Sequence, residues 1–509
     1  MKTLIAFAGA LVFGTAVYAQ GTSIGAAECE RLAASLGAHN AKVTAATAIV
    51  AGHFMPPPAA GSTAAPAALG DLPAFCRVQL TLTPSADSDI RSEIWLPMKG
   101  WNGKFQQVGN GGWGGSIQYA ALATALRRGY AAASTDTGHV GDTARFALGH
   151  PEKLIDFGYR AVHETAVRSK AVITGAYGVG PRFSYFNGCS GGGRQGFMEA
   201  QRYPDDFDAI IAGAPGYNRT DQSFQLVLAS LATHRDEASF IPASKLPALH
   251  KAALNACDAR DGAPDGLISD PMTCRVDPNV LACKDADGAE CLTPAQIEAA
   301  KRIYAPVIDP RTGREVFPGV EAGSEPRWTV NAGGPRPLGM SDELFKYVVF
   351  KDPEWDFRTL DVAKHLDMAR RADGGTISAT SPNIKSFVDR GGKLIIYHGW
   401  GDTNVPPRSS VNYYDKLVET LGKNQVASSA RLYLVPGMGH CGGGEGPNVF
   451  DMVTVAEEWR ERGKAPTEVI ASQIVDGKVV RTRPLCQYPL IPRYKGSGSL
   501  DQAASFECR

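Results

Sequence analysis

The stretch FNGCSGGGRQG, residues 186–196, places a serine where an apolar strand pattern gives way to a helical one. RFSYFNGCS (182–190) is typical of a buried strand, and GRQGFMEAQRYP (193–204) is typical of a helix. Ser190 therefore lies in a G-x-S-x-G pattern at a strand-to-helix turn, which projects a serine hydroxyl above a sheet. Glycines suit this turn because its backbone is strained and crowded. The stretch predicts an α/β fold with Ser190 as a candidate nucleophile.

Context separates Ser190 from a second match to the same pattern. In a chain with 56 glycines the pattern alone is weak, and GTSIG (21–25) matches it as well. GTSIG follows no strand and adjoins MKTLIAFAGALVFGTAVYAQ (1–20), which is typical of a secretory signal peptide. We predict cleavage after Ala19, so that residues 1–19 are a signal peptide and the protein is secreted or periplasmic.

Strand-like and helix-like segments alternate on both sides of Ser190. Strands, some with the loop that follows, are predicted at 74–83, 91–98, 104–115, 130–139, 207–215, 391–407 and 430–441, and helices at 119–129, 160–178, 409–422 and 448–463. This alternation favours a mostly parallel sheet with helices on both faces.

The alternation fails between about Tyr217 and Ser386. This segment is rich in Asp, Gly, Pro and Trp and holds four of the cysteines, so we interpret it as an insertion. The predicted organisation is a core in two parts, 20–216 and 387–509, with a lid domain at 217–386 between them.

The composition excludes some classes of partner. Hydrophobic residues make up 44% and charged residues 20% of the chain, as in ordinary globular proteins. Lysine plus arginine equal aspartate plus glutamate at 52 each, so no overall basic field attracts nucleic acid or an anionic membrane. After the N-terminal segment, no run of about 18 apolar residues predicts a membrane span. The oligomeric state has no signature in the sequence.

The ten cysteines are an even number in a chain predicted to enter an oxidising compartment, which indicates five disulfides. Pairs that close short local loops are Cys257 with Cys274, Cys283 with Cys291, and Cys486 with Cys508. The alternative is a zinc site, but the chain has no CxxC pair and no HxxxH spacing to support it.

Two further motifs supply partners for Ser190. A serine hydroxyl becomes nucleophilic when a histidine takes its proton and an acid holds that histidine in the right tautomer. Asp402 follows the strand in 391–407 and His440 the strand in 430–441, so the chain order is Ser, Asp, His, as in α/β-hydrolases. Asp402 as a mere turn residue and His440 as a mere loop residue are the alternatives.

His398 is a competing candidate for the base. Because it precedes Asp402 at the same strand end, we interpret it as a pocket or structural residue. The oxyanion hole needs two backbone N–H groups. We expect one from Gly191 and the other from the loop GNGGWGG, where Gly112 is favoured and Gly111 is the close alternative. A phosphate-binding reading of that loop lacks a following GK[ST] or G-x-G-x-x-G.

The motifs GCSGG (188–192), WGDTNVPP (400–407) and GMGHCGGG (437–444) together resemble the tannase and feruloyl esterase family of secreted serine esterases. In that family the cysteines beside the serine and the histidine form a disulfide. The resemblance covers nearly the whole chain after the N-terminal segment. It implies an α/β-hydrolase core with a lid inserted before the strand that carries the acid.

The resemblance also implies the cysteine pairing: Cys29–Cys76, Cys189–Cys441, Cys257–Cys274, Cys283–Cys291 and Cys486–Cys508. For Cys189–Cys441 there is an independent physical argument, since a triad brings Ser190 and His440 within hydrogen-bond reach and therefore brings their neighbours close enough to bridge. In the chain-entropy model such a loop of about 250 residues contributes at most on the order of 5 kcal/mol.

The segment CDARDGAPDGLISD (257–270) gathers hard oxygen ligands in a tight loop, which suits Ca²⁺ better than Zn²⁺. It is not an EF-hand, because the spacing differs and no terminal glutamate follows. The resemblance implies a structural calcium ion in the lid, and a solvated acidic loop is the alternative. The implied ligands are the carboxylates of Asp258, Asp261 and Asp265 and the carbonyls of Ala263 and Leu267.

Members of the family cleave feruloyl esters, galloyl esters or the half-ester of terephthalate and ethylene glycol, so the resemblance implies a small ester substrate with an aromatic acyl group. Aromatic lid residues are candidates for a flat apolar slot, with simple lid packing as the alternative. The candidates are Trp328, Phe345 and Phe350, together with Tyr347, Trp355 and Phe357.

The sequence assigns no arginine to a terephthalate carboxylate, so that substrate is the least favoured. We predict a feruloyl-type esterase, with tannase next. A hypothesis of another class is a secreted, non-catalytic binding protein on a hydrolase fold, against which the intact triad argues.

Overall fold

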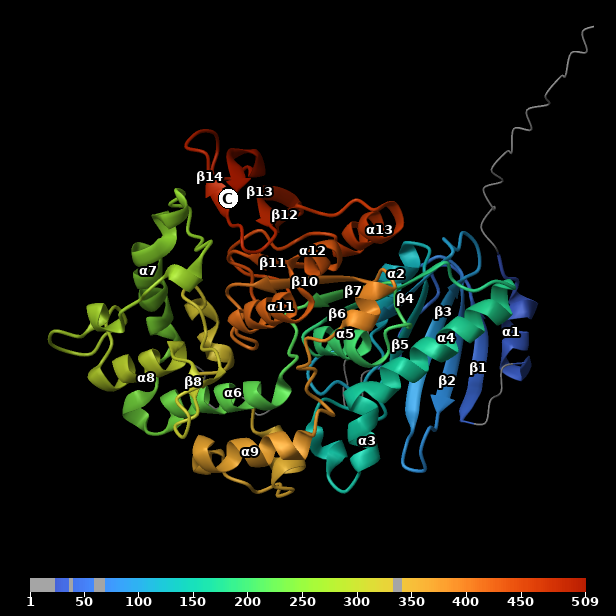
Figure 1. The fold of residues 1–509 in the computed structure, drawn as a ribbon, viewed down its shortest axis with the longest axis horizontal. Helices are drawn as coiled ribbons and strands as arrows, with labels where there is room; N and C mark the ends of the chain where they lie inside the picture. The colour runs from blue at the N-terminus through green and yellow to red at the C-terminus, as the bar shows by residue number, and fades with distance from the viewer. Residues whose placement is uncertain (1–22, 36–39, 59–68, 333–340) are drawn as a thin grey trace, which may run out of the picture.

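The computed structural model describes residues 23–35, 40–58, 69–332 and 341–509. The predicted signal peptide, residues 1–19, lies outside these ranges. In the described part of the chain, a large sheet with helices on both faces occupies one side of the molecule, and a group of helices around α7 and α8 lies on the other side (Figure 1).

Within the described residues the central sheet has nine strands in the order β1-β2-β3-β5-β4-β6-β7-β10-β11. Their bounds are β1 Ala41–Ile49, β2 Phe75–Leu82, β3 Ile90–Pro97, β4 Lys104–Val108, β5 Ala131–Thr135, β6 Phe183–Cys189, β7 Ala209–Gly213, β10 Lys393–Gly399 and β11 Ala430–Val435. The strands from β5 to β11 in this order run parallel, as predicted.

The other edge of the sheet differs from the prediction. β1, β2 and β3 pair antiparallel, and β3 is also antiparallel to β5. β1 was not predicted at all, because its alanine-rich sequence AKVTAATAI carries few large apolar residues. The parallel part of the sheet therefore carries the candidate site, while the antiparallel strands extend the sheet away from it.

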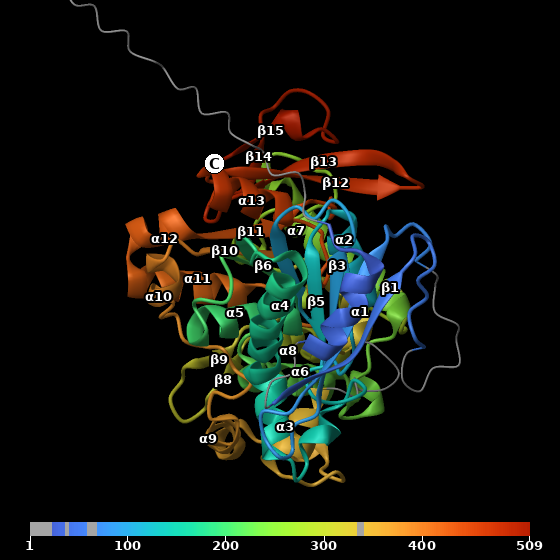
Figure 2. The same ribbon diagram turned by 90° about the vertical axis from the view of Figure 1, so that its right-hand side faces the viewer.

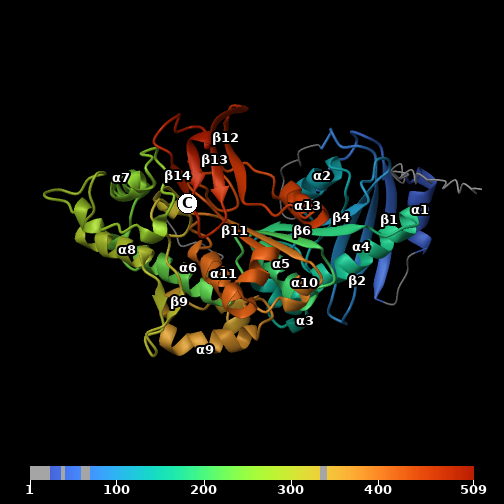
Figure 3. The ribbon, with the colours of Figure 1, turned by 45° about the horizontal axis from the view of Figure 1, so that its top comes forward.

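Two hydrophobic clusters cover the two faces of the sheet because side chains alternate along each strand. In β10, Leu394 and Ile396 point into one cluster and Ile395 into the other. Helices α1, α4, α5, α10, α11 and α12 contribute to the first face and α2 and α13 to the second, and Figure 3 shows α13 and α2 on one side of the strands with α5 and α11 on the other. Their bounds are α1 Ala26–Ser35, α2 Tyr119–Arg127, α4 Ala161–Tyr177, α5 Gly191–Arg202, α10 Lys385–Asp389, α11 Arg408–Leu421, α12 Lys423–Ser429 and α13 Met452–Arg462.

The segment predicted as a lid packs largely on itself. Three hydrophobic clusters draw all their buried members from residues 224–369. The chain leaves and re-enters the core at neighbouring points, since the N–H of Ala379 donates to the carbonyl of Tyr217 over 2.6 Å. The elements of this segment are α6 Arg219–His234, α7 Leu246–Cys257, α8 Pro294–Tyr304, α9 Val362–Asp373, β8 Val307–Ile308 and β9 Glu315–Phe317.

The C-terminal part adds small antiparallel hairpins that were not predicted. Figure 2 shows β12 and β13 above α13, at the end of the molecule opposite α3. Their bounds are β12 Glu468–Val475, β13 Lys478–Cys486, β14 Pro492–Tyr494 and β15 Phe506–Cys508, with α3 at Pro151–Ile155.

All five disulfides form with the predicted pairing: Cys29–Cys76, Cys189–Cys441, Cys257–Cys274, Cys283–Cys291 and Cys486–Cys508. Five disulfides fit an oxidising, extracellular setting. Among the helices of the described residues, none combines the length and the apolar character that crossing a membrane requires.

Candidate active site

Ser190 occupies a strained turn between β6 and α5. Its φ of 63° and ψ of −118° lie in a region that non-glycine residues rarely adopt. The turn requires glycines around it, because a Cβ on Gly188 would lie 2.7 Å from the carbonyl carbon of Gly192. The predicted sharp turn is therefore present, and it leaves Ser190 partly exposed at the end of the strand.

Asp402 and His440 follow the ends of the neighbouring strands β10 and β11. Nδ1 of His440 lies 2.6 Å from Oδ2 of Asp402. The other carboxylate oxygen of Asp402 accepts the backbone N–H groups of Asn404 at 2.8 Å and Val405 at 3.0 Å. These bonds hold the buried carboxylate in one orientation, with its Oδ2 toward the histidine.

Charge and burial act in opposite directions on this pair. Burial by itself raises the pKa of Asp402, but the charge of His440 and hydrogen bonds from His398 and His440 hold that pKa well below its ordinary value. Burial by itself lowers the pKa of His440, but the charge and hydrogen bond of Asp402 raise it above its ordinary value. Asp402 therefore stays ionised and makes His440 a stronger base.

His398 contacts the same carboxylate from within the core. It is fully buried, and its Nε2 lies 3.1 Å from Oδ2 of Asp402 and 2.8 Å from the carbonyl oxygen of Val405. Because both neighbours of Nε2 are acceptors, Nε2 carries the proton, and Nδ1 then accepts from the hydroxyl of Ser410 at 2.8 Å. His398 is thus placed to orient Asp402, in line with a structural role.

Ser190 and His440 line one cavity of about 610 Å³. Cys189 and Cys441, which form the disulfide between the two loops, are part of the same wall. The disulfide therefore joins the serine loop directly to the histidine loop. Ser190 and His440, two of the predicted catalytic residues, both line this cavity. Asp402, the third, is hydrogen-bonded to Nδ1 of His440.

Of the two expected oxyanion donors, Gly112 lines the cavity and Gly191 directly follows Ser190. Gly191 is the first residue of α5, so the helix supplies no carbonyl partner for its N–H. Gly111 and Gly112 line the cavity on the opposite loop. Gly112 has a φ of 55°, and a Cβ there would lie 2.6 Å from Oδ1 of Asp142, so only glycine fits.

The aromatic residues expected to form the substrate slot lie elsewhere. Trp328 is 1% exposed and Phe345 0% exposed, each inside a cluster of the inserted segment. Phe350 packs on Trp355, with ring centroids 5.1 Å apart. None of Trp328, Phe345 and Phe350 is among the described residues that line the cavity beside Ser190. Their expected role in the slot is corrected: the large apolar side chains of this segment fill its own core, because that is where their surface is removed from water.

Sequence reasoning missed the residues of the inserted segment that do face this cavity. Arg219, Gln222 and Leu226 of α6 line it. Their spacing of three and four residues was a usable signal, since it places all three on one helix face directly after the last strand of the first core part. Two of the three are polar, however, whereas the predicted slot consisted of aromatic residues.

The expected calcium loop has buried carboxylates. The side chain of Asp258 accepts backbone N–H groups of Gly266 at 2.9 Å and Leu267 at 3.2 Å, and Asp261 accepts the Ser269 hydroxyl at 2.5 Å. Asp265 pairs with Arg483.

Burial raises the pKa of both Asp261 and Asp265, because it removes water from their charged carboxylates. The donor set of hard oxygens fits a Ca²⁺ ion in chemistry and charge.

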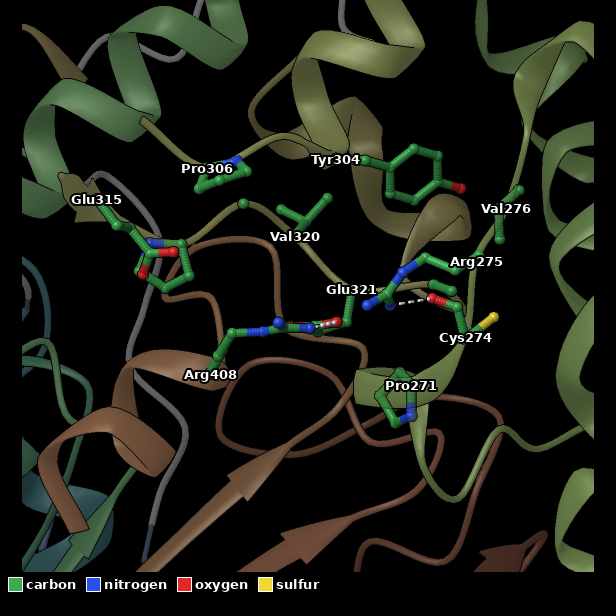
Figure 4. Close-up of a pocket in the computed structure, with 13 residues that line it drawn as sticks. Pro271, Cys274, Arg275, Val276, Tyr304, Pro306, Glu315, Val320, Glu321 and Arg408 are labelled. Carbon is green, nitrogen blue, oxygen red and sulfur yellow. Dashed lines mark hydrogen bonds and ion pairs between the residues drawn. The ribbon is translucent and has the colours of Figure 1, made fainter. Parts of the chain in front are cut away.

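A second cavity of about 300 Å³ lies between the inserted segment and the start of α11 (Figure 4). The guanidinium of Arg408 in its wall bonds both carboxylate oxygens of Glu321, at 2.7 Å and 3.0 Å. Arg275 donates to the carbonyl of Cys274 at 2.8 Å. The cations of this cavity therefore already have partners, and none of its lining residues belongs to the Ser190 cavity.

The fold and the cavity define the class of the protein. A sheet of parallel strands with a serine at a strand-to-helix turn, and an aspartate and a histidine after later strands, is the arrangement of α/β-hydrolase enzymes.

Comparison with known proteins narrows this class. The family described as tannase and feruloyl esterase matches residues 76–509. The chain belongs to the tannase and feruloyl esterase family, and it is a carboxylic ester hydrolase.

Individual relatives agree with this assignment. An uncharacterised esterase from Xanthomonas campestris is 37% identical over 96% of this chain and 92% of its own length. A probable feruloyl esterase B-1 from Aspergillus fumigatus is 33% identical over 94% of each chain. The crystal structure of feruloyl esterase B from Aspergillus oryzae has a TM-score of 0.89 at 30% identity, covering 95% of this chain and all of that one.

Proposed function

We propose that the protein hydrolyses esters of aromatic acids, with feruloyl-type hydroxycinnamoyl esters as the preferred class, through an acyl-enzyme on Ser190. The observation that carries the proposal is the shared cavity wall of Ser190 and His440, with the Nδ1 of His440 2.6 Å from Asp402. Relatives named feruloyl esterase B, similar over nearly the whole chain, support the aromatic acyl group.

In the proposed mechanism, Nε2 of His440 takes the proton of Ser190 as its Oγ attacks the ester carbonyl carbon. The N–H groups of Gly191 and Gly112 stabilise the negative oxygen of the tetrahedral intermediate. His440 then gives the proton to the alcohol oxygen as the bond to the alcohol breaks. A water molecule, deprotonated by His440, attacks the acyl-enzyme and releases the acid, and the proton returns to Ser190. Asp402 stays charged throughout and stabilises the imidazolium.

A serine-directed phosphonate tests this assignment. We expect a mass increase on the peptide that contains Ser190, and loss of p-nitrophenyl ester hydrolysis in proportion to labelling. The Ser190→Ala variant is the control, because it removes the nucleophile and should take up no label. A wild-type protein that neither labels nor hydrolyses the ester is a non-catalytic binding protein, and the proposal fails.

A substrate panel tests the acyl preference. Methyl ferulate, methyl gallate and mono-hydroxyethyl terephthalate are compared by kcat/KM, which measures discrimination in the transition state. We expect methyl ferulate to rank first. If kcat/KM is highest for methyl gallate, the protein is a tannase in activity. If it is highest for the terephthalate half-ester, the proposed preference for feruloyl-type esters is wrong.

We further propose that the protein is exported and works outside the cytoplasm. The five disulfides and the N-terminal sequence, typical of a signal peptide, support this. Fractionation of the producing cell tests it: activity and protein should appear in the medium or the periplasm, without residues 1–19 in the mass of the purified protein.

We propose that residues 217–386 act as a lid domain stabilised by a structural Ca²⁺ ion. Asp258, Asp261 and Asp265, with the carbonyls of Ala263 and Leu267, would hold the ion, which supplies positive charge to a loop of buried carboxylates. The expected result of EDTA treatment is a lower melting temperature that Ca²⁺ restores and Mg²⁺ does not. An Asp261→Asn variant should lose this response. An unchanged melting temperature in EDTA would contradict the calcium proposal.

A further inference from the structure

The helix that follows β7 presents polar side chains to the catalytic cavity. Arg219, Gln222 and Leu226 of α6 all line the cavity that contains Ser190. They lie three and four residues apart, which places them on one face of the helix. Leu226 offers apolar surface, whereas Arg219 and Gln222 offer hydrogen-bonding atoms.

Arg219 is a cation that no described carboxylate bonds directly. Its guanidinium stacks on Trp113, with Cζ 4.5 Å from the ring centroid, and its buried Nε has no hydrogen-bond partner among the described residues. Burial lowers the pKa of Arg219 to about 10, partly offset by the charges of Glu343 and Asp142. Arg219 therefore remains protonated at neutral pH and places a positive charge in the cavity wall.

Gln222 supplies the opposite hydrogen-bonding character. It is 2% exposed, and its Nε2 donates to the carbonyl of Asn404 over 2.6 Å. This bond fixes the orientation of the amide, so Oε1 is the atom that has no partner in the described part of the chain, and it can only accept. Asn404 also lines the cavity, and its Oδ1 likewise has no partner there.

The second cavity makes the difference clear. There, Arg408 bonds both carboxylate oxygens of Glu321 (Figure 4), so this cation already has a charged partner. Around the catalytic cavity, Arg219 and Gln222 line one wall, and among the described residues Nε of Arg219 and Oε1 of Gln222 have no hydrogen-bond partner. Buried polar atoms without partners cost free energy, and at a binding site a ligand removes that cost.

A hydroxyl group is the ligand group that complements both atoms, because it accepts one hydrogen bond and donates another. A carboxylate satisfies Arg219 but faces the lone pairs of Gln222 Oε1. We propose that Arg219 and Gln222 bind a hydroxyl of the substrate: Arg219 donates to the hydroxyl oxygen, and the hydroxyl donates to Oε1 of Gln222. The inference rests on the proposed esterase function and adds a specificity site to it.

Two parts of an ester can carry this hydroxyl: the aromatic ring of the acyl group or a sugar that forms the alcohol. The test compares kcat/KM for methyl cinnamate, methyl 4-hydroxycinnamate and a cinnamoyl ester of arabinose. Compared with methyl cinnamate, the methyl ester of 4-hydroxycinnamate adds only a phenolic hydroxyl, whereas the arabinose ester replaces the methyl group by a sugar with its hydroxyls. Each hydroxylated ester is compared with methyl cinnamate by kcat/KM. If the higher kcat/KM of one of them depends on Arg219 and Gln222, that ester carries the hydroxyl that the site binds.

The variants are Gln222→Leu, Arg219→Leu and the conservative Arg219→Lys, with Gln225→Leu as a matched control. Gln225 lies on the same helix and also has a buried Oε1 without a partner, but it lines a different cavity. We expect the advantage of the hydroxylated ester to fall about fivefold in Gln222→Leu and tenfold or more in Arg219→Leu, because the latter bond is charged. Arg219→Lys should retain part of the advantage, and Gln225→Leu all of it. Melting temperatures identify any variant that has lost its fold.

The inference is overturned if the kcat/KM ratio of the hydroxylated ester to methyl cinnamate is unchanged in Gln222→Leu and Arg219→Leu. It is also overturned if Gln225→Leu reduces this ratio equally. A selective loss of monomethyl terephthalate hydrolysis in Arg219→Leu overturns it as well, because that would make the site a carboxylate site. Failure of the esterase proposal has a different signature, since the wild type then hydrolyses none of the esters. In that event, the Kd values of methyl cinnamate and methyl 4-hydroxycinnamate are measured by calorimetry. The wild type should bind the hydroxylated ester more tightly than methyl cinnamate, and Gln222→Leu should lose this difference.

Discussion

The catalytic edge of the core and the cavity face of α6 differ in how their polar side chains are satisfied. At the core edge, Asp402 is bonded by two backbone N–H groups and two histidines. On α6, Arg219 and Gln222 have buried atoms that no other described residue bonds. Catalysis is the same for every ester, so it requires catalytic groups that are already held in one geometry. Recognition of a particular ester requires polar atoms whose hydrogen bonds the bound ligand supplies.

The largest effect that this comparison predicts is the loss of activity when Asp402 at the catalytic edge of the core is replaced. In Asp402→Asn the amide keeps the shape of the side chain but no longer holds His440 in the tautomer that accepts a proton at Nε2. We expect kcat for a p-nitrophenyl ester to fall by about 10⁴, with KM and melting temperature nearly unchanged. A fall of less than tenfold would mean that Asp402 does not orient the base.

The next prediction distinguishes residues that stabilise the inserted segment from residues that contact the substrate. Trp328 is buried, with its Nε1 donating to the Ser324 hydroxyl at 3.1 Å. Trp328→Ala should lower the free energy of unfolding by about 3–5 kcal/mol, measured by denaturant titration, and leave KM of the folded protein unchanged. Leu226→Ala is the contrast, since it lines the cavity and should raise KM. A raised KM in Trp328→Ala would return Trp328 to the substrate slot.

The disulfide across the site gives a prediction of intermediate size. Replacing Cys189 and Cys441 together by serine removes a bond between residues 252 apart in sequence. We expect the free energy of unfolding to fall by about 2–4 kcal/mol and kcat to fall as well, because the loops of Ser190 and His440 lose their link. The control replaces Cys486 and Cys508, which are 22 residues apart and are not among the described residues that line the cavity. Equal kcat in the two double variants would contradict the link.

The smallest expected effect is in the pH profile. His440 must be neutral to accept the serine proton, so kcat/KM should fall as pH drops through the pKa of His440. Because that pKa is raised by Asp402, the midpoint should lie above about 6.5, measured between about pH 5 and about pH 8. In Asp402→Asn the midpoint should move to lower pH. A wild-type midpoint at or below the ordinary histidine value would show that Asp402 does not stabilise the imidazolium.

The sequence by itself determined the parts of this protein that depend on local pattern. The strands β6, β10 and β11 have apolar runs, and each is followed by one of Ser190, Asp402 and His440. Because parallel strands end at the same edge of a sheet, order along the chain was enough to predict that these residues meet. The family resemblance implied the bond between Cys189 and Cys441, and the closeness of Ser190 and His440 in a triad gives an independent physical reason for it.

Only the tertiary structure decided which side chains of the inserted segment face the cavity. Trp328 and Phe345 turned out to fill its core, while Arg219 and Gln222 line the cavity beside Ser190. The physical reason is that a side chain's surroundings depend on how its helix is rotated and packed against the rest of the chain. Residue type predicts that large apolar groups leave water, but not which of the available interiors they enter, and it does not reveal which polar atoms remain without partners.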